Sequence, residues 1–237
     1  MKYVEKYAGE IAQFVKVTGK LAANGYVTGY GGNAAWKLED DLIIITPTMM
    51  NKGDITSADV VFINMAGDTV EGTRRPTGER PMYIKFFNDR PDIMSVIHCH
   101  APNVGTFAII EGENPLMRPL FPETAHEVGP VPVVPYGEPL TQQLADNFEP
   151  FIRKYNSFIM ENHGLVTMSP EGIGYTMMNV ELLEASAYSI LQAMVAGRKL
   201  KEMSREAIEG LDNVMKQRNC PMFGAPGVYE SLVELYF

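Results

Sequence analysis

Three histidines in two short motifs are the residues of this chain best suited to chemistry. The chain has four histidines in 237 residues, and two of them, His98 and His100, flank Cys99 in the segment SVIHCHAPN. Alternate side chains of a strand point to the same face, so these two imidazoles lie about 7 Å apart on one face, with Cys99 on the other. Such a pair can bind one metal ion. Two buried histidines bonded to backbone carbonyls are an equal alternative.

Two further residues extend this pair. His163 lies in ENHG directly after the apolar segment SFIM, which places it at the end of a second strand. Glu79 lies in RRPTGERP just before a helix, where unpaired backbone N–H groups favour an anion. Taken alone, His163 would be a turn residue and Glu79 a helix N-terminal charge. Together with the pair, they predict a metal site.

The N-terminal half shows the elements that must position these residues. Apolar spacing predicts an amphipathic helix from the start through Leu21, stopped at Asn24-Gly25. A glycine-rich turn, TGYGGN, follows, and DLIIITPT and ADVVFINMAGDTV are typical of strands. A helix over Pro81 to Asn88 then leads to the strand MSVIHCH, which ends before Pro102.

The C-terminal half continues the alternation. VPVVPYG and SFIMENHG predict two short strands, with a helix over LTQQLADNFEPFIRKY between them. Ser169 in SPEG is expected to cap a long helix that runs to about Leu200, and another helix begins at Ser204. The tail from Pro221 is punctuated by Gly and Pro and is rich in aromatic residues. We find no repeat or linker, so we predict a single α/β domain with helices packed on a sheet, over residues 1–237.

Composition narrows the class of protein. A formal net charge of −9 disfavours nucleic acid, because binding to a phosphate backbone needs clustered Lys and Arg. No apolar stretch approaches the length of a membrane span and no secretion signal is present, so we expect a cytoplasmic protein with no membrane partner. Two cysteines in a chain of this size do not form a disulfide framework, and both are expected to be thiols.

Six motifs in order carry a resemblance to a known family. TGYGGN, IIITPT, PTGE, VIHCHAPN, VPVVPYGEPLT and NHGLV resemble the class II aldolase and adducin superfamily of sugar-phosphate enzymes, over about Tyr3 to Gln217. The resemblance implies a central, mostly antiparallel β-sheet flanked by helices in three layers. It also implies a homotetramer with active sites at subunit borders. A zinc ion, or another divalent metal, would be held by His98, His100 and His163.

The resemblance also implies catalytic roles for two carboxylates. A glutamate at the place of Glu79 touches the metal and works as the base, and glutamate rather than aspartate there favours aldolases over the 4-epimerase. In the rhamnulose type a second glutamate precedes the VPVVPY-like strand, which corresponds to Glu123 in FPETAHEVG, with Glu127 as the alternative.

The phosphate-binding positions of the family are kept in part. The family's Gly-Asn turn and threonines correspond to Gly32, Asn33, Thr48 and Thr77. Two positions depart from the family: Met49 stands where glycine is usual and Gly78 where serine is usual, which removes a close backbone approach and a hydroxyl donor. Lys52 could supply a compensating charge.

The function that the resemblance implies is a zinc-dependent retro-aldol cleavage. A ketose 1-phosphate of the fuculose or rhamnulose type would give dihydroxyacetone phosphate and an aldehyde such as L-lactaldehyde, by way of a metal-stabilised enediolate. Schiff-base chemistry instead needs a lysine of lowered pKa, and Lys85 and Lys154, in mixed and solvated stretches, offer no candidate.

Several other activities remain open at this stage. Within the superfamily they are a sugar-phosphate 4-epimerase, a keto sugar acid phosphate decarboxylase, a dehydratase and a non-catalytic adducin-like binding module. A cupin also carries H-x-H on a strand, but it is an all-β barrel and would not contain these long helices.

Overall fold

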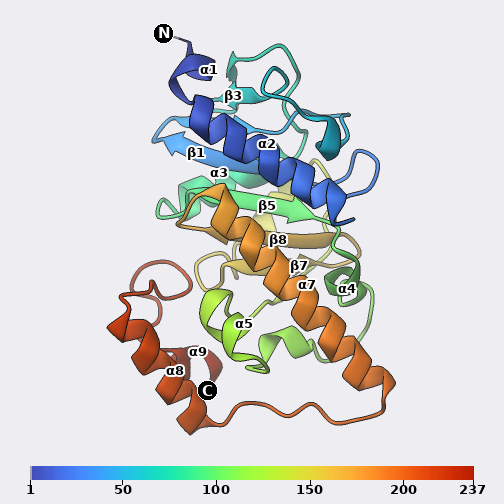
Figure 1. Ribbon diagram of the computed structural model, residues 1–237, viewed down its shortest axis with the longest axis vertical. Coiled ribbons are helices and arrows are strands. Elements are labelled where there is room, and N and C mark those ends of the chain that lie inside the picture. The colour runs from blue at the N-terminus through green and yellow to red at the C-terminus, as the bar shows by residue number, and fades with distance from the viewer. Residues whose placement is uncertain (1) are drawn as a thin grey trace.

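An eight-stranded sheet forms the middle layer of the computed structural model, which describes residues 2–237 (Figure 1). The strand order is β4-β3-β2-β1-β5-β8-β7-β6, and β6 and β7 form the one parallel pair among these strands. The predicted single α/β domain with a mostly antiparallel sheet flanked by helices is therefore confirmed. The strands are β1 Asn33–Glu39, β2 Leu42–Ile45, β3 Val61–Ile63, β4 Thr69–Glu71, β5 Ser95–Cys99, β6 Val133–Val134, β7 Ser157–Met160 and β8 Gly164–Ser169.

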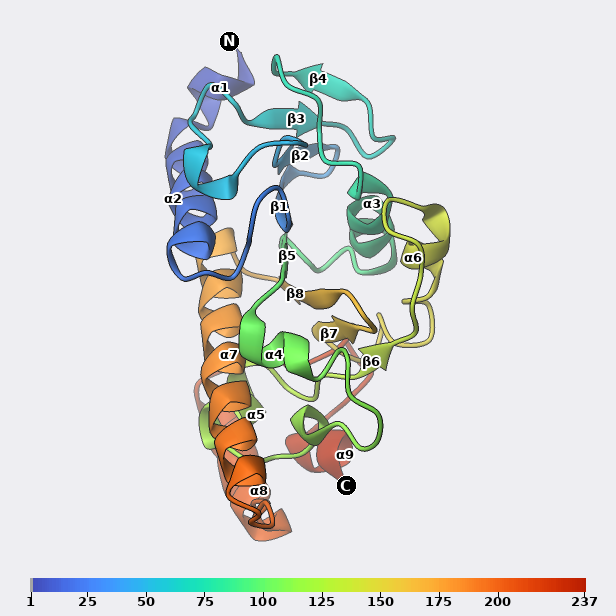
Figure 2. The ribbon, with the colours of Figure 1, turned by 90° about the vertical axis from the view of Figure 1, so that its right-hand side faces the viewer.

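Helices cover both faces of this sheet. Figure 2 shows α2 and α7 on one side of the strands and α3 and α6 on the other. The α-helices are α1 Tyr3–Lys6, α2 Ala8–Ala23, α3 Arg80–Asp89, α4 Pro102–Thr106, α5 Pro122–Glu127, α6 Gln142–Asp146, α7 Ile173–Val195, α8 Arg205–Gln217 and α9 Leu232–Tyr236. Two short 3-10 turns, η1 Lys52–Asp54 and η2 Pro115–Met117, lie in the loops.

Alternation along the strands divides the core into two layers. Leu42 and Ile44 of β2 pack in the cluster under α2 and α7, whereas Ile43 and Ile45 pack in the cluster under α3 and α6. The same alternation places Val96 of β5 in the α3 layer and Cys99 in the α7 layer. The side chains on the α3 face of β5 therefore point toward the start of α3, where Glu79 lies.

Two predicted helices have different limits in the structure. The helix expected over LTQQLADNFEPFIRKY is α-helical only from Gln142 to Asp146, and turns follow, because Pro150 interrupts the pattern. The long helix α7 begins after Gly172 instead of being capped by Ser169, and it ends at Val195 instead of near Leu200. Ser169 is the last residue of β8, and its hydroxyl accepts a hydrogen bond from the backbone N–H of Glu171.

Other segments depart from the prediction in smaller ways. The strands β1 and β8 and the short helices α4, α5 and α9 were not predicted. The segment ADVVFINMAGDTV forms the β3–β4 hairpin rather than one strand. The helix predicted from Ser204 is α8, and Ser204 is its N-cap, with its hydroxyl accepting from the backbone N–H of Ala207. Within residues 2–237, no helix has the length and apolar character needed to cross a membrane.

Candidate metal centre and its pocket

Two neighbouring central strands bring the three histidines together at their ends. β5 carries His98 and ends at Cys99, so His100 follows the last strand residue, and β8 pairs beside it with His98 opposite Val166. A tight turn between β7 and β8 supplies His163. Asn162 in that turn adopts a left-handed conformation, with φ 54°. The imidazole nitrogens of the three histidines lie within 4.8 Å of one another.

The donor atoms are presented in a form suited to a metal. His98 Nδ1 lies 2.9 Å from the carbonyl oxygen of Leu165, so that nitrogen carries the proton and Nε2 keeps its lone pair. His98 Nε2 and His100 Nε2 are 3.1 Å apart. Two nitrogens on one tetrahedral zinc ion, each about 2.0–2.1 Å from it, lie about 3.3 Å apart, so this spacing fits a shared ion.

Burial keeps two of these imidazoles neutral. Desolvation lowers the pKa of His98 to about 4, with the charge of Glu79 opposing this effect and the two other histidines adding to it. The pKa of His100 is lowered as well, mainly by burial. A neutral imidazole is the form that ligates a metal, so both residues are ready to bind at neutral pH.

Glu79 completes this cluster from the N-terminus of α3. Its carboxylate oxygens lie 3.7 Å from His98 Nε2 and 3.6 Å from His163 Nε2, and the residue is only 5% exposed. Burial alone would raise the pKa of Glu79, but the positive charge that the histidines, chiefly His98, take on at acidic pH and a hydrogen bond from Asn33 outweigh it, so the pKa is lowered. Glu79 is therefore a buried carboxylate directed at the three imidazoles.

A buried chain of hydrogen bonds holds that carboxylate. The Asn33 side-chain amide donates to Glu79 Oε2 at 2.7 Å, and Asn33 Oδ1 in turn accepts from the Tyr83 hydroxyl. Tyr83 is fully buried, and this burial, with the nearby charge of Glu79, raises its pKa well above 10, so the hydroxyl stays a donor. Tyr83 thereby fixes which end of the Asn33 amide faces Glu79.

Glycines leave room for the histidine rings. A Cβ on Gly164 would lie 2.6 Å from the carbonyl oxygen of Cys99 and 2.9 Å from His100 Cδ2. A Cβ on Gly31 would lie 2.8 Å from the other edge of the His100 ring. His100 therefore sits between two backbone segments that can approach it only because they lack side chains.

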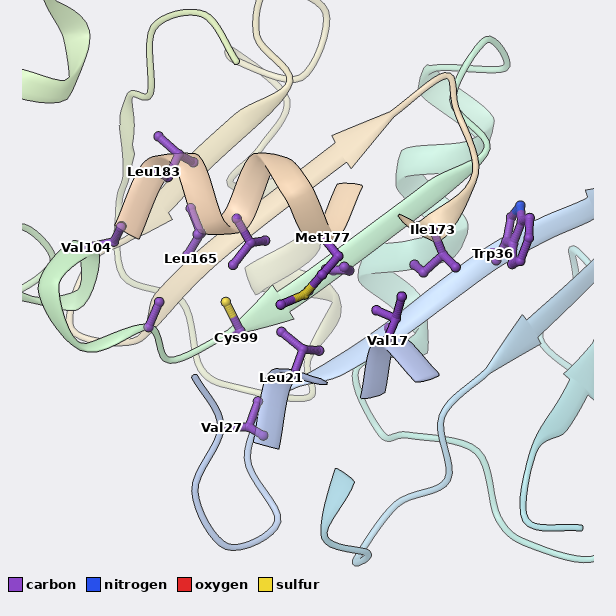
Figure 3. Close-up of a cluster of buried hydrophobic side chains, with 14 of the residues drawn as sticks. Val17, Leu21, Val27, Trp36, Cys99, Val104, Leu165, Ile173, Met177 and Leu183 are labelled. Carbon is purple, nitrogen blue, oxygen red and sulfur yellow. The ribbon is translucent and has the colours of Figure 1, made fainter. Parts of the chain in front are cut away.

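Cys99 takes no part in this cluster. Its side chain points to the opposite face of β5, into the core between the sheet and α7, where Leu21 and Met177 surround it (Figure 3). Burial raises the pKa of the thiol to about 12, so it is protonated at neutral pH. A protonated, inward-facing thiol is not a metal ligand.

The residues present fit a divalent metal ion. Three imidazoles converge, His98 has its Nδ1 proton fixed by a carbonyl, and the buried His163 Nδ1 has no hydrogen-bond partner within the described residues. Three histidine ligands with a neighbouring carboxylate are typical of catalytic zinc sites, which keep one position for substrate. The donor set therefore supports a transition-metal ion, and imidazole nitrogens suit zinc, copper, iron and nickel.

A pocket of about 190 Å³ opens onto this cluster. Every residue predicted to bind phosphate lines it, as do Glu79 and the three histidines. The lining residues are Tyr30, Gly31, Gly32, Asn33, Pro47, Thr48, Met49, Lys52, Thr77, Gly78, Glu79, His98, His100, Leu140 and His163. The pocket has the size for a small polar molecule rather than for a polymer.

Lys52 is the functional candidate that the sequence undervalued. It is only 2% exposed, and burial lowers its pKa to about 8, with Glu79 opposing the effect. The expectation that the chain offers no lysine of lowered pKa was wrong, because Lys52 is such a residue. Its burial depends on contacts with segments distant in the chain, such as the carbonyl oxygen of Tyr30.

Glu123, the predicted second carboxylate, and its alternative Glu127 lie away from this pocket in the single chain. Glu123 is exposed on α5. Glu127 accepts a hydrogen bond from the Tyr175 hydroxyl and lies 3.2 Å from His126 Nδ1. Neither belongs to the described residues that line the pocket of the histidines. Their roles stay predictions.

Comparison with known proteins agrees with this architecture. The family model "Class II Aldolase and Adducin N-terminal domain" matches residues 12–191. A 3-oxo-tetronate 4-phosphate decarboxylase from Pectobacterium atrosepticum is 26% identical over 84% of this chain and 91% of its own length. An L-fuculose phosphate aldolase from Methanocaldococcus jannaschii is 31% identical over 74% of this chain and 92% of its own length. The crystal structure of YgbL from Klebsiella pneumoniae covers 86% of this chain and 98% of its own, with 25% identity and a TM-score of 0.79.

The three-layer α/β fold gathers three histidines and a buried glutamate at the ends of neighbouring strands, an arrangement suited to a divalent metal ion. The chain belongs to the class II aldolase and adducin family. Its relatives include class II aldolases and decarboxylases, which supports an enzyme.

Proposed function

We propose that this chain is a zinc-dependent class II aldolase. It would cleave a ketose 1-phosphate of the fuculose or rhamnulose type to dihydroxyacetone phosphate and an aldehyde such as L-lactaldehyde. The observation that carries the proposal is Glu79, a buried carboxylate of lowered pKa beside three imidazoles in a sugar-sized pocket. The likeness to the L-fuculose phosphate aldolase supports it further.

Cleavage of the carbon–carbon bond needs a group that stabilises the resulting carbanion and a group that transfers a proton. Cleaving the carbon–carbon bond leaves an electron pair on the carbon next to the ketone. A divalent ion held by the three histidines would act as a Lewis acid toward the ketone and its neighbouring hydroxyl. In condensation the Glu79 carboxylate would remove the proton from that carbon and pass it to solvent. In cleavage Glu79 would first take up a proton from solvent and then donate it to that carbon, while Asn33 keeps the carboxylate in place.

The second proton, on the hydroxyl of the breaking bond, is assigned to Glu123. Because Glu123 is exposed on α5 and outside the pocket of its own chain, this role requires that it reach the pocket of another copy. A homotetramer with sites at subunit borders would allow that, and sedimentation equilibrium tests for it. A solution monomer with full activity would remove Glu123, and with it Glu127, from the mechanism.

Decarboxylation of a keto sugar acid phosphate is the second candidate. Glu79 is the one carboxylate among the described residues that line the pocket. Loss of carbon dioxide leaves the same electron pair beside a carbonyl, but it needs no base for a hydroxyl proton. The likeness to the 3-oxo-tetronate 4-phosphate decarboxylase points the same way.

One experiment separates these candidates. Zinc-loaded protein is incubated with dihydroxyacetone phosphate and L-lactaldehyde, and separately with 3-oxo-tetronate 4-phosphate. Products are followed by mass, chiral chromatography and carbon dioxide release. The aldolase proposal predicts a new phosphorylated ketose in the first reaction, and its loss in Glu79→Gln. Carbon dioxide release without condensation would favour the decarboxylase, and activity in neither reaction would leave the 4-epimerase and the binding module.

The remaining parts of the proposal concern the whole chain. We propose that residues 1–237 act as one catalytic domain, in the cytoplasm, with small sugar phosphates as its substrates. Limited proteolysis tests the first point. A stable fragment that lacked the C-terminal helices and kept full activity would contradict it.

A further inference from the structure

We propose that Glu184 is a positioning residue of the metal centre. From the middle of α7 it caps the N-terminus of α4, and α4 in turn sets how His100 and His163 lie relative to each other. The inference rests on the proposed function only in requiring that the three histidines hold a divalent ion, and it is independent of the reaction. Glu184 is not among the residues that line the pocket of the histidines, so it acts through the backbone of α4.

The carboxylate of Glu184 satisfies the backbone donors in the first turn of α4, which a helix leaves without intrahelical partners. Glu184 Oε1 accepts from the backbone N–H of Asn103 at 2.9 Å and from the side-chain amide of the same residue at 2.7 Å. Glu184 Oε2 accepts from the backbone N–H of Val104 at 3.0 Å. Pro102, the first residue of α4, has no N–H. The cap of α4 therefore comes from a residue 81 positions away from Asn103 in the chain.

A cap from another helix does more than a local cap would. Helices are usually capped by a Ser, Thr, Asp or Asn at the N-cap position, but here that position holds Ala101, which is fully buried and makes no side-chain cap. A local cap fixes a helix only to its own chain. Because Glu184 belongs to α7, its hydrogen bonds also fix where α4 lies against α7 (Figure 2). Glu184 is only 6% exposed, so any N–H that it released would be left buried and unpaired.

The α4 segment is connected to two of the three histidines. Its first residue, Pro102, follows His100 by two positions. In the turn directly after α4, the carbonyl oxygen of Ala108 accepts a hydrogen bond from the backbone N–H of Asn162 at 2.8 Å. Asn162 is the left-handed residue immediately before His163. A displacement of α4 would therefore be transmitted to His100 at one end and to His163 at the other.

The third histidine does not depend on α4. His98 lies within β5 and is hydrogen-bonded to the carbonyl oxygen of Leu165 in β8, so the sheet itself holds it. His100 and His163 lie beyond the strand ends, and their ring centroids are 5.6 Å apart. Loss of the cap should therefore move two ligands and leave one in place. Fewer imidazole nitrogens would then reach the ion together, which weakens its binding and changes its coordination geometry.

The main test compares metal binding by wild type and Glu184→Gln. Glutamine keeps the shape of the side chain but places an NH2 group where one carboxylate oxygen accepts, so a donor faces the N–H groups of α4. Zinc affinity is measured by competition with a chromophoric chelator, and ligand geometry is read from the visible spectrum of Co²⁺-loaded protein. We expect Glu184→Gln to lose about ten- to hundredfold in zinc affinity, the loss typical when a residue that orients metal ligands is changed. Its Co²⁺ bands should change as well.

Two control variants separate positioning from general stability. Glu181→Gln removes a carboxylate from the same helix, but Glu181 accepts hydrogen bonds from Lys20 and Asn24 rather than from α4. Ile208→Val trims a fully buried side chain of α8, in a separate core cluster. Both should keep the zinc affinity and the Co²⁺ spectrum of wild type. A Glu184 that served only the stability of the fold would leave the spectrum of the fully loaded protein unchanged.

Should Glu184→Gln fail to fold, hydrogen exchange of the wild-type protein gives the answer. Thermodynamic linkage requires that zinc stabilise the capped α4 as much as the cap stabilises bound zinc. Saturating zinc should therefore slow exchange of the Val104 and Asn162 amides, which are bonded to Glu184 and to the turn after α4. The Arg218 amide at the end of α8 should be unchanged. Equal exchange of Val104 and Asn162 with and without zinc would contradict the inference.

The remaining outcomes distinguish this inference from the proposed reaction. The inference is overturned if wild type and Glu184→Gln have equal zinc affinity and Co²⁺ spectra, if either control loses as much affinity, or if the wild-type histidines bind neither ion. Metal binding that depends on Glu184, without aldol condensation, would reject the proposed reaction and keep the inference. Aldol condensation with metal binding that does not depend on Glu184 would do the reverse.

Discussion

Removal of one buried oxygen tests the hydrogen-bonded chain that holds Glu79. In Tyr83→Phe the ring stays in its fully buried site, and only the donor to Asn33 Oδ1 is lost. That amide oxygen is then left without a partner in a residue only 7% exposed. An unsatisfied buried acceptor costs about 1–3 kcal/mol, and removal of the hydroxyl's own burial offsets part of this, so we expect about 1–2 kcal/mol less unfolding free energy.

The assay is urea unfolding of metal-free protein, followed by circular dichroism, in a double-mutant cycle with Asn33→Ala. When Asn33 is already alanine, the Tyr83 hydroxyl has lost its side-chain acceptor, and removal of the hydroxyl should cost much less or be stabilising. Zinc stoichiometry should be unchanged in Tyr83→Phe, because all three histidines remain. The reasoning is refuted if Tyr83→Phe costs nothing, or if it costs the same with and without Asn33.

Three further changes probe the surroundings of the site. Met49→Gly should leave the unfolding free energy unchanged or raise it by up to about 1 kcal/mol, because glycine relieves the left-handed conformation and the lost side chain is exposed. Gly164→Ala should weaken zinc binding about tenfold or more, as its Cβ would press on Cys99 and His100, whereas Gly19→Ala in α2 has open space and should not. Lys52 has a pKa lowered from 10.5 to about 8, so the unfolded chain binds more protons between these values. Wild-type stability should therefore rise with pH in that window, by up to about 3 kcal/mol relative to Lys52→Met.

Each of these predictions has a clear contrary result. A loss of more than about 1 kcal/mol in Met49→Gly would mean that the methionine packs against the protein. Equal zinc affinity in the Gly164 and Gly19 variants, by competition with a chromophoric chelator, would show that the histidines have more room than the structure gives them. If the unfolding free energies of wild type and Lys52→Met changed in parallel from pH 7 to 11, the Lys52 side chain would be solvated and its pKa would not be lowered.

The sequence predicted those elements whose signals lie within their own residues. The strand that carries His98 is a compact β-branched run ended by a proline, and the helix after Ser204 carries its own cap, so both were predicted. β1 was not predicted, because Asn33, Lys37 and two alanines obscure the alternation of apolar and polar residues that is typical of a strand. It is a strand because β2 and β5 pair with it on both sides.

The candidate site likewise has a part that local motifs predict and a part that depends on distant segments. The histidines stand in short motifs at strand ends, and their convergence could be anticipated from the sequence. The partners that tune the site come from far along the chain. Asn33 and Glu79 are 46 residues apart, and Lys52 reaches the carbonyl of Tyr30 from 22 residues away. Burial of Lys52 and the Tyr83 hydrogen bond arise only when these segments pack together, so no local pattern signals them.

Direct measurement of zinc binding tests the central claim, that His98, His100 and His163 form one metal site. Crystals grown with excess zinc should show, by anomalous scattering at the zinc edge, one ion per chain about 2.0–2.1 Å from a nitrogen of each histidine. The ion should be absent from His163→Ala crystals treated in the same way. Wild-type crystals in which these rings point apart, or in which zinc lies elsewhere and leaves the three histidines bare, would contradict the account.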